Sequence, residues 1–154
     1  MSESEAWKYF VSSPAYEVVP AIEVAGRIPA MTLMSNNLIP GADNYIEAGW
    51  ILAMPDPATH IMEHTHDYDE IVMHIGTDPE DPEELGAEIE FVVDGETLSI
   101  DKTSSVFVPK GVKHGPLTWK SFRKPHLEMT VMLGAGNLAE ADPGGHQEKM
   151  GEDT

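Results

Sequence analysis

The stretch HIMEHTHDYDEIVMHIG, residues 60–76, decides the fold and the chemistry expected of this chain. His64 and His66 are two residues apart, so on an extended strand both imidazoles lie on one face, with their Cα atoms roughly 6–7 Å apart. Glu70 follows the turn-forming residues 67–69, where the chain can bend and bring its carboxylate to the same point. The spacing predicts that two imidazoles and one carboxylate share a metal ion.

A third imidazole is expected from the segment PKGVKHGP, residues 109–116. Pro109 and Gly111 predict a tight turn that delivers His114 near the start of the next strand. Three imidazoles and one carboxylate, without sulfur, suit Fe, Mn, Co, Ni, Cu or Zn. On an octahedral ion these four ligands leave two adjacent positions for a chelating substrate.

These residues resemble the two motifs of the cupin superfamily, G-x5-H-x-H-x3-4-E-x6-G and G-x5-P-x-G-x2-H-x3-N. The matching positions are His64, His66 and Glu70 in the first motif and Pro109, Gly111 and His114 in the second. The departures are Ala58 and Thr103 in place of the leading glycines, Gly76 one residue early, and Thr118 in place of Asn. The resemblance covers residues 58–118. It implies an all-β, single-domain antiparallel barrel (jelly roll) with the metal inside, bound by His64, His66, Glu70 and His114.

The resemblance implies one divalent transition metal ion per chain, with Fe or Mn first and Zn, Ni or Co as alternatives. Cupins include dioxygenases, isomerases, decarboxylases, lyases and sugar-sensing domains, so the fold does not choose the reaction. We expect a metal-dependent enzyme whose small organic substrate chelates the metal, with an Fe(II)-type dioxygenase or oxidoreductase first. The alternatives are a non-redox Mn, Zn or Ni lyase, isomerase or hydrolase, a non-catalytic cupin that binds a small molecule, and an acidic interaction protein whose barrel is only a scaffold.

The rest of the chain is predicted to form short strands because β-branched and aromatic residues alternate with Gly, Pro, Asn and Asp clusters. The predicted strands are Tyr16–Val24, Met31–Met34, Ile46–Met54, Thr59–His64, Glu70–Ile75, Glu88–Val93, Thr97–Ile100, Val106–Val108 and His126–Leu133. Asp94 and Gly95 predict a two-residue hairpin, because both tolerate the positive φ angles of a type I′ turn.

Several further residues are candidates for the site. The candidate catalytic groups are His126, Glu128, Tyr68 and His60, and the candidate pocket residues are Trp50, Met62, Val72, Phe107 and Trp119. Each has a structural alternative: a water-binding His60 at the barrel mouth, an exposed Tyr68 in a turn, an outward polar stripe for His126 and Glu128, and ordinary core for the apolar residues. His74 is expected to be a buried, hydrogen-bonded histidine.

The composition and net charge limit the classes of partner that the chain can be expected to bind. The chain has 154 residues, 9 Lys plus Arg, 27 Asp plus Glu, no Cys and a net charge of −18. Such a charge repels phosphate backbones and anionic lipid surfaces, so we expect neither nucleic acid nor membrane as a partner. We expect a small-molecule substrate, with an anionic compound among the candidates. A core of this size needs no metal to hold it, so a metal here is predicted to be functional. The N-terminus has no basic region followed by an apolar stretch, and we expect a cytoplasmic protein.

The organisation predicted along the chain is one barrel domain, residues 1–133, and an acidic, flexible tail, residues 134–154, which could also pack on a partner subunit. A homodimer is expected through exposed outer strands. Thr77–Gly86 is predicted to be a solvated acidic loop, with an ion-binding loop as the alternative.

The charges along the chain are segregated. No Lys or Arg lies between Arg27 and Lys102, a stretch with 17 acidic residues, whereas Lys102–Leu127 holds six basic residues and no acid. Either these two segments neutralise each other in the fold, or the basic one attracts an anionic substrate.

Overall fold

The computed structural model describes residues 2–16, 24–27 and 30–136. Within these residues it has one short helix, α1 (Ser2–Trp7), and is otherwise built of strands. The strands are β1 (Ala25–Arg27), β2 (Met31–Met34), β3 (Asn44–Asp56), β4 (Thr59–Ile61), β5 (Asp69–Gly76), β6 (Glu84–Val93), β7 (Glu96–Lys102), β8 (Ser104–Val108), β9 (His114–Phe122) and β10 (His126–Leu133). The prediction of an all-β chain is confirmed.

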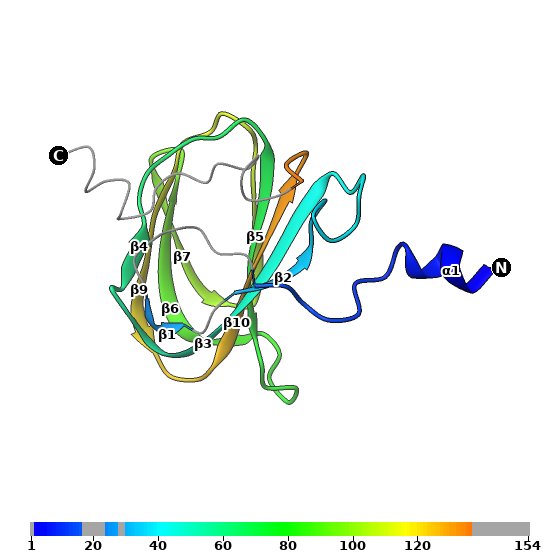
Figure 1. The fold of residues 1–154 in the computed structure, drawn as a ribbon. Helices are drawn as coiled ribbons and strands as arrows, with labels where there is room; N and C mark the ends of the chain where they lie inside the picture. The colour runs from blue at the N-terminus through cyan, green and yellow to red at the C-terminus, as the bar shows by residue number, and fades with distance from the viewer. Residues whose placement is uncertain (1, 17–23, 28–29, 137–154) are drawn as a thin grey trace.

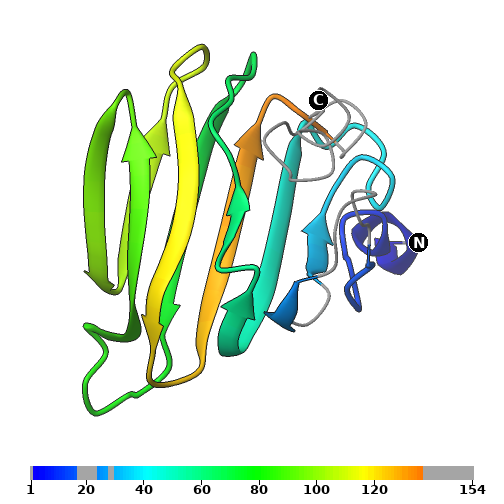
Figure 2. The ribbon, with the colours of Figure 1, turned by 90° about the vertical axis from the view of Figure 1, so that its left-hand side faces the viewer.

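The strands form two antiparallel sheets that face each other as the walls of a barrel (Figure 1 and Figure 2). The six-stranded sheet has the order β1-β3-β10-β5-β8, with β2 pairing to β3. The four-stranded sheet has the order β4-β9-β6-β7. Neighbours in these orders are mostly far apart in sequence, so the barrel closes only when distant segments meet.

The inner face of the four-stranded sheet is apolar. Side chains alternate across a strand, and every second residue of β6 and β9 is buried against the opposite sheet. The buried core formed there comprises Leu85, Ala87, Ile89, Phe91, Ile100, Leu117 and Trp119, packed against Ile51, Val72 and Val108 of the six-stranded sheet. This core joins the two sheets.

The inner face of the six-stranded sheet is largely polar. Its register aligns Glu70 with Met132, His74 with Glu128, and Thr130 with Glu47, so these side chains share one face. The polar residues on that face include Arg27, Thr32, Tyr45, Glu47, Glu70, His74, His126, Glu128 and Thr130. Most of them are buried, which places ionisable groups inside the barrel.

The outer faces have the reverse character. The outward positions of the six-stranded sheet form a surface that we call the apolar outer face: Met31, Ile46, Ala48, Trp50, Leu52, Ile71, Met73, Ile75, Phe107, Leu127, Met129, Val131 and Leu133. The outward positions of the four-stranded sheet form a surface that we call the acidic outer face, and they include Glu88, Glu90, Ser99, Asp101 and Lys120. The two sheets are therefore opposite in polarity.

Most predicted strands coincide with observed ones, and His126–Leu133 and Met31–Met34 have the predicted bounds. Three predictions were wrong. Strand β1 was missed because it is only three residues long and contains Gly26, and β9 was missed because its Gly115, Pro116 and Lys120 weaken the strand pattern. The strand predicted to run to His64 ends at Ile61. The predicted strand Tyr16–Val24 lies mostly outside the described residues.

The predicted turns can be compared in the same way. Asp94 and Gly95 have φ angles of 51° and 80° between β6 and β7, as the hairpin prediction requires. The acidic loop is shorter than Thr77–Gly86, because β6 begins at Glu84 and Leu85 is buried in the core.

The start of the predicted tail, residues 134–136, is described and packed. Ala135 is buried with Tyr45, Tyr68 and Met132, and the remainder of the tail lies outside the described residues. No helix in the described ranges is both long enough and apolar enough to span a bilayer.

Candidate metal centre

Three imidazoles meet at one end of the barrel. One ring nitrogen each of His64, His66 and His114 lies within 4.8 Å of the other two. The ring centroids are 4.2 Å apart for His64 and His114, 4.6 Å for His66 and His114, and 5.5 Å for His64 and His66. The structure thus brings together the three histidines that the sequence predicted to be ligands.

Local backbone pairing sets this convergence. His64 and His114 form an isolated antiparallel bridge, with N···O distances of 2.9 and 3.0 Å in the two directions. The next residue, Gly115, has a φ of 102°, and a Cβ added there would overlap the carbonyl oxygen of Met62. Glycine is therefore required for the two segments to approach closely enough to bring the rings together.

Backbone carbonyls fix the orientation of all three rings. The Nδ1 atoms of His64, His66 and His114 lie 2.8, 3.1 and 2.9 Å from the carbonyl oxygens of Met62, Tyr68 and Val112, respectively. A carbonyl only accepts, so each Nδ1–H donates, and the lone pair of each neutral ring is left on Nε2. Histidines that bind metals are oriented by such bonds.

Glu70 completes the group. Its Oε1 atom lies 3.3 Å from Nε2 of His66 and 3.3 Å from Nε2 of His114. Both distances are long for an N–H···O bond, and the buried Nε2 of His114 makes no hydrogen bond of standard geometry. Atoms about 2.1 Å from a shared ion, at octahedral to tetrahedral angles, are about 3.0–3.4 Å apart. Glu70 is therefore spaced from two of the imidazoles as two ligands of one divalent transition metal would be, while the group within 4.8 Å comprises the three histidines alone.

Burial and charge act on these groups in opposite directions. Burial lowers the pKa of His64, which favours the neutral ring that a metal requires. Burial also opposes the charged form of His114, but the neighbouring Glu70 outweighs it and raises the pKa of that ring. For Glu70, burial opposes ionisation, yet contacts with His114 and His66 lower its pKa to about 2. The site therefore holds a carboxylate at neutral pH.

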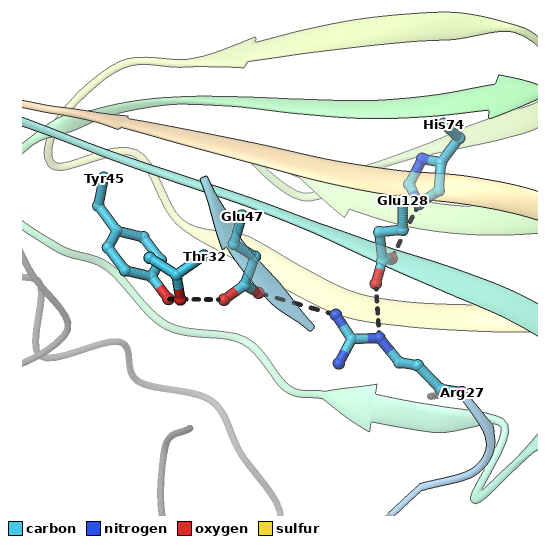
Figure 3. Close-up of polar contacts among 6 residues, drawn as sticks. All are labelled: Arg27, Thr32, Tyr45, Glu47, His74 and Glu128. Atoms are coloured by element: carbon cyan, nitrogen blue, oxygen red, sulfur yellow. Dashed lines mark hydrogen bonds and ion pairs between the residues drawn. The ribbon is translucent and has the colours of Figure 1, made fainter. Parts of the chain in front are cut away.

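A second polar group runs through the barrel interior from the six-stranded sheet (Figure 3). Arg27 Nε donates to Glu128 Oε1 at 3.2 Å, and its terminal nitrogen lies 3.7 Å from Glu47 Oε1. Glu128 also accepts from His74 Nε2 at 3.0 Å, while Tyr45 donates its hydroxyl to Glu47 at 3.0 Å. One guanidinium thus bridges the buried carboxylate of Glu128 and the partly buried carboxylate of Glu47.

Glu47 has an unusual environment within this group. Burial raises its pKa, and the attraction of Arg27 and the hydrogen bond from Tyr45 offset only part of that effect. A carboxylate of this kind can exchange a proton nearer to neutral pH than an exposed one.

Solved structures share this architecture. No protein-family model matches the sequence, and no curated protein is similar enough to count as a relative. An oxalate oxidase in complex with glycolate matches with a TM-score of 0.53 and 13% identity, over 94% of this chain and 66% of that one. A predicted oxalate decarboxylase from Thermotoga maritima matches with a TM-score of 0.51 and 12% identity, over 79% of this chain and 91% of that one. An RmlC-like cupin from Shewanella frigidimarina has a TM-score of 0.49 and 15% identity, over 82% and 88% of the two chains.

The chain has the cupin fold, as the two matches with TM-scores above 0.5 show. Its two antiparallel sheets enclose the three histidines, as the resemblance of the motifs led us to expect. The departures at Ala58, Thr103 and Thr118 leave this cupin barrel intact, and Thr59 and Thr118 are joined by a hydrogen bond of 2.7 Å between their hydroxyls.

The candidate catalytic residues have different positions in the cupin barrel. His126 accepts from Trp119 Nε1 and donates from Nδ1 to the Lys124 carbonyl, so both ring nitrogens are engaged and it is not paired with Glu128. Glu128 binds His74 and Arg27, and both Glu128 and His126 face inward rather than forming an outward stripe. His74 is buried and hydrogen-bonded, as predicted.

Tyr68 is buried rather than exposed in its turn. Its ring stacks on His66 at a centroid distance of 3.8 Å and an interplanar angle of 3°. Its hydroxyl faces the packed interior, so Tyr68 supports the ring of a proposed ligand. The side chain of His60 lies outside the described residues.

The predicted pocket residues divide between the two faces of the cupin barrel. Val72 and Trp119 are buried on the inner faces, and Met62 supplies the carbonyl that orients His64. The prediction that Trp50 and Phe107 line the pocket was wrong, because both occupy strand positions whose side chains point outward. Phe107 is 55% exposed.

Sequence reasoning missed Arg27, Tyr45 and Glu47 as interior residues. A signal was present: Glu47 is the only charged residue in the apolar run of residues 45–54, and Arg27 is the last cation before the long stretch without one. What the sequence lacked was the pairing of β1 with β3, which brings Arg27 to that strand.

The basic segment pairs with the acidic one. Arg123 lies 2.6 Å from Glu84, Lys124 lies 3.6 Å from Asp78, and Lys120 lies 3.9 Å from Glu90. These exposed contacts favour mutual neutralisation over recruitment of a substrate.

Proposed function

We propose that this cupin is a metal-dependent enzyme whose small organic substrate chelates an ion held by His64, His66, His114 and Glu70. The observation that carries the proposal is the shared orientation of the three rings, in which each Nδ1 is bonded to a backbone carbonyl and each Nε2 faces the same point. Three structural histidines packed for stability would have no reason to share that orientation. This pattern is what a metal ligand needs before the ion arrives.

The residues around the site prepare it for chemistry. Glu70 supplies the negative charge that offsets a cation, and the carbonyls of Met62 and Val112 hold two of the rings in place. Val72, Val108 and Met132 are buried on the positions beside Glu70 and keep water from that side of the carboxylate. A dry surrounding of this kind strengthens interactions between charges.

Fe(II) is the ion we favour, and an oxygenase or oxidoreductase is the reaction class we propose. When bound, Fe(II) would supply one-electron chemistry with O₂, with positions left open for a chelating acid or diol. The similarity in fold to an oxalate oxidase in complex with glycolate supports a small hydroxy-acid, keto-acid or enediol as the type of substrate to test.

The test is oxygen consumption by protein loaded with Fe(II) under anaerobic conditions, with a panel of hydroxy-acids, keto-acids and enediols. We expect at least one compound to drive consumption that depends on iron, and His114→Gln to abolish it. His126→Gln is the matched control, because it changes a buried histidine outside the group and should retain activity. Oxygen uptake that persists in His114→Gln would contradict the assignment.

A second candidate rests on Glu47. A carboxylate inside the barrel with a raised pKa favours proton transfer, which lyases and isomerases require and which needs no oxidant. Protein loaded with Mn, Zn or Ni would then convert a chelating substrate in the absence of O₂, and Glu47→Gln would slow conversion while leaving the metal content unchanged. If no metal supports any conversion and a ligand still binds, the barrel is a binding module.

A further inference from the structure

The interior of the barrel holds more negative than positive charge. Of the described residues, the charged side chains that face the interior are Arg27, Glu47, Glu70 and Glu128, so three carboxylates face one guanidinium. With neutral imidazoles, a divalent ion at the metal centre would bring this sum to zero. A substrate that chelates the ion through a carboxylate would make the interior negative again, unless another part of the substrate carries a positive charge.

Two of these carboxylates already have partners. The Oε1 atom of Glu128 accepts from Arg27 at 3.2 Å, and its Oε2 atom accepts from His74 Nε2 at 3.0 Å. Glu70 faces the imidazoles of the metal centre. Neither Glu70 nor Glu128 is therefore available to a further group of the substrate.

The third carboxylate, that of Glu47, has one acceptor oxygen to spare (Figure 3). Its Oε2 atom accepts from the Tyr45 hydroxyl at 3.0 Å, whereas its Oε1 atom lies 3.7 Å from the terminal nitrogen of Arg27, which is too long for a hydrogen bond. The Glu47 side chain is 19% exposed although it points into the barrel, so a small molecule can reach it. Glu47 Oε1 is therefore the interior acceptor that a substrate can use.

Glu47 and the metal centre lie on the same inner face of the six-stranded sheet. The register aligns Glu70 with Met132 and Met132 with Tyr45, and Glu47 follows two residues along β3. Two strand spacings and two residues correspond to a backbone separation of about 12 Å. Since both side chains point inward from the same curved wall, their carboxylates are closer than their backbones, and an acid of about four or five carbons spans the remaining gap.

From these features we infer that the substrate is a chelating acid with a cationic group at its other end, and that this group, an ammonium or a similar donor, binds Glu47 Oε1. The inference rests on the proposed function, in which the substrate chelates the ion, and it adds what the rest of the substrate must carry. A dicarboxylate is the class of compound that it excludes.

The electrostatics of Glu47 favour such a group. Burial raises the pKa of Glu47, and the attraction of Arg27 and the hydrogen bond from Tyr45 offset only part of that effect. The charges of Glu128 and Glu70 raise the pKa further. A cation beside Glu47 would stabilise its ionised form, whereas a second carboxylate on the substrate would be repelled by it, and charges interact strongly where water is scarce.

The test compares matched 2-hydroxy acids for binding to Zn(II)-loaded protein, by isothermal titration calorimetry at pH 7, because zinc supports binding without redox chemistry. One pair is 4-amino-2-hydroxybutanoate and malate, and the other is 5-amino-2-hydroxypentanoate and 2-hydroxyglutarate. Within each pair the chelating end is the same, and only the far end changes from ammonium to carboxylate. We expect the ammonium compound of at least one pair to bind about tenfold or more tightly than its dicarboxylate partner.

Glu47→Gln should remove most of that preference, because the amide keeps the shape of the side chain and loses its charge. Glu90→Gln is the matched control, because Glu90 lies on the acidic outer face with its side chain 44% exposed, and it should keep the preference. A preference that persists undiminished in Glu47→Gln would overturn the inference.

The wild-type protein tests the inference even if Glu47→Gln does not fold. Dicarboxylates that bind the wild type as tightly as the ammonium compounds would overturn the inference and leave the proposed function standing, because chelation would still occur. If none of the four acids binds the metal-loaded protein, the proposed function is overturned together with the inference.

Discussion

The two sheets of the barrel bury opposite kinds of side chain. The four-stranded sheet directs Phe91, Trp119 and their neighbours inward and presents Glu88, Glu90 and Asp101 to solvent. The six-stranded sheet directs Glu70, Glu128 and the rest of its polar set inward and presents Ile71, Met129 and other apolar side chains outward. Side chains alternate along a strand, so each sheet has one apolar face and one polar face. The four-stranded sheet turns its apolar face towards the barrel interior, whereas the six-stranded sheet turns its polar face inward.

The difference separates two tasks. The four-stranded sheet supplies the packing that makes the barrel stable, because burial of apolar area is the main favourable contribution to folding. The six-stranded sheet supplies Glu70 of the candidate metal centre and the buried ion pairs around Arg27, which cost desolvation and so contribute less to stability. The ionisable groups of the interior therefore lie on the six-stranded sheet, whereas most of the apolar core lies on the four-stranded sheet.

The largest expected effect is on the apolar wall. Phe91→Ala should lower the free energy of unfolding by about 3–5 kcal/mol, because Phe91 is 2% exposed and its loss leaves a cavity between the sheets. The matched change Leu98→Ala, at the position paired with Phe91 on β7, should cost less than about 1 kcal/mol. Urea unfolding followed by circular dichroism measures both. Equal losses in the free energy of unfolding for the two variants would show that Phe91 contributes no more to the core than the exposed Leu98.

The next effect concerns the ion pairs of the polar wall. Arg27→Met should cost about 3 kcal/mol, because it leaves the buried Glu128 and the partly buried Glu47 without their shared cation. Lys120→Met removes an exposed ion pair with Glu90 on the acidic outer face and should change stability by less than about 0.5 kcal/mol. The comparison is made by urea titration at pH 7. An Arg27→Met protein as stable as the wild type would mean that the buried carboxylates do not depend on that guanidinium.

A smaller effect is expected in the pH dependence of stability. Burial lowers the pKa of His126, which is also near His74 and Glu128, so the unfolded chain takes up a proton at this residue more readily than the folded one. Stability should therefore be unaffected by His126 above the ordinary value of about 6.5 and should fall as the pH drops below it.

The measurement is the loss in free energy of unfolding between pH 7 and pH 5, in chelator, for the wild type and His126→Gln. The other titrating groups, including His64 and Glu47, are present in both proteins, so their contributions cancel in the difference. We expect the smaller loss in the variant. A larger loss in the variant would reverse the assigned direction.

The sequence predicted the three clustered histidines and Glu70 because their placement depends on local geometry. Two histidines on one face of an extended segment and a Pro-Gly turn before His114 follow from residue spacing alone. The cores of most strands followed from composition. The bounds that failed, those of β9 and of the segment before His64, lie where Gly, Pro and irregular pairing interrupt the pattern.

The interior of the six-stranded sheet could not be predicted in the same way. Apolar residues are expected inside, so Trp50 and Phe107 were assigned to the pocket. On this sheet, however, the alternate strand positions that carry apolar residues face outward. The contact of Arg27 with Glu128 joins residues 101 positions apart, which no local pattern encodes. Only the assembled sheet reveals which set of alternate residues faces the barrel interior.

The metal content per chain tests the metal centre most directly; it is measured by elemental analysis after metal-free protein is incubated with Fe(II), Mn(II) or Zn(II) and desalted. We expect close to one ion per chain for the wild type and for His126→Gln, because the ring nitrogens of His126 are already engaged by Trp119 and the Lys124 carbonyl. For His114→Gln we expect almost none. Equal metal content in the two variants, or a wild-type chain that retains none of these ions, would contradict the assignment of the three imidazoles as a metal centre.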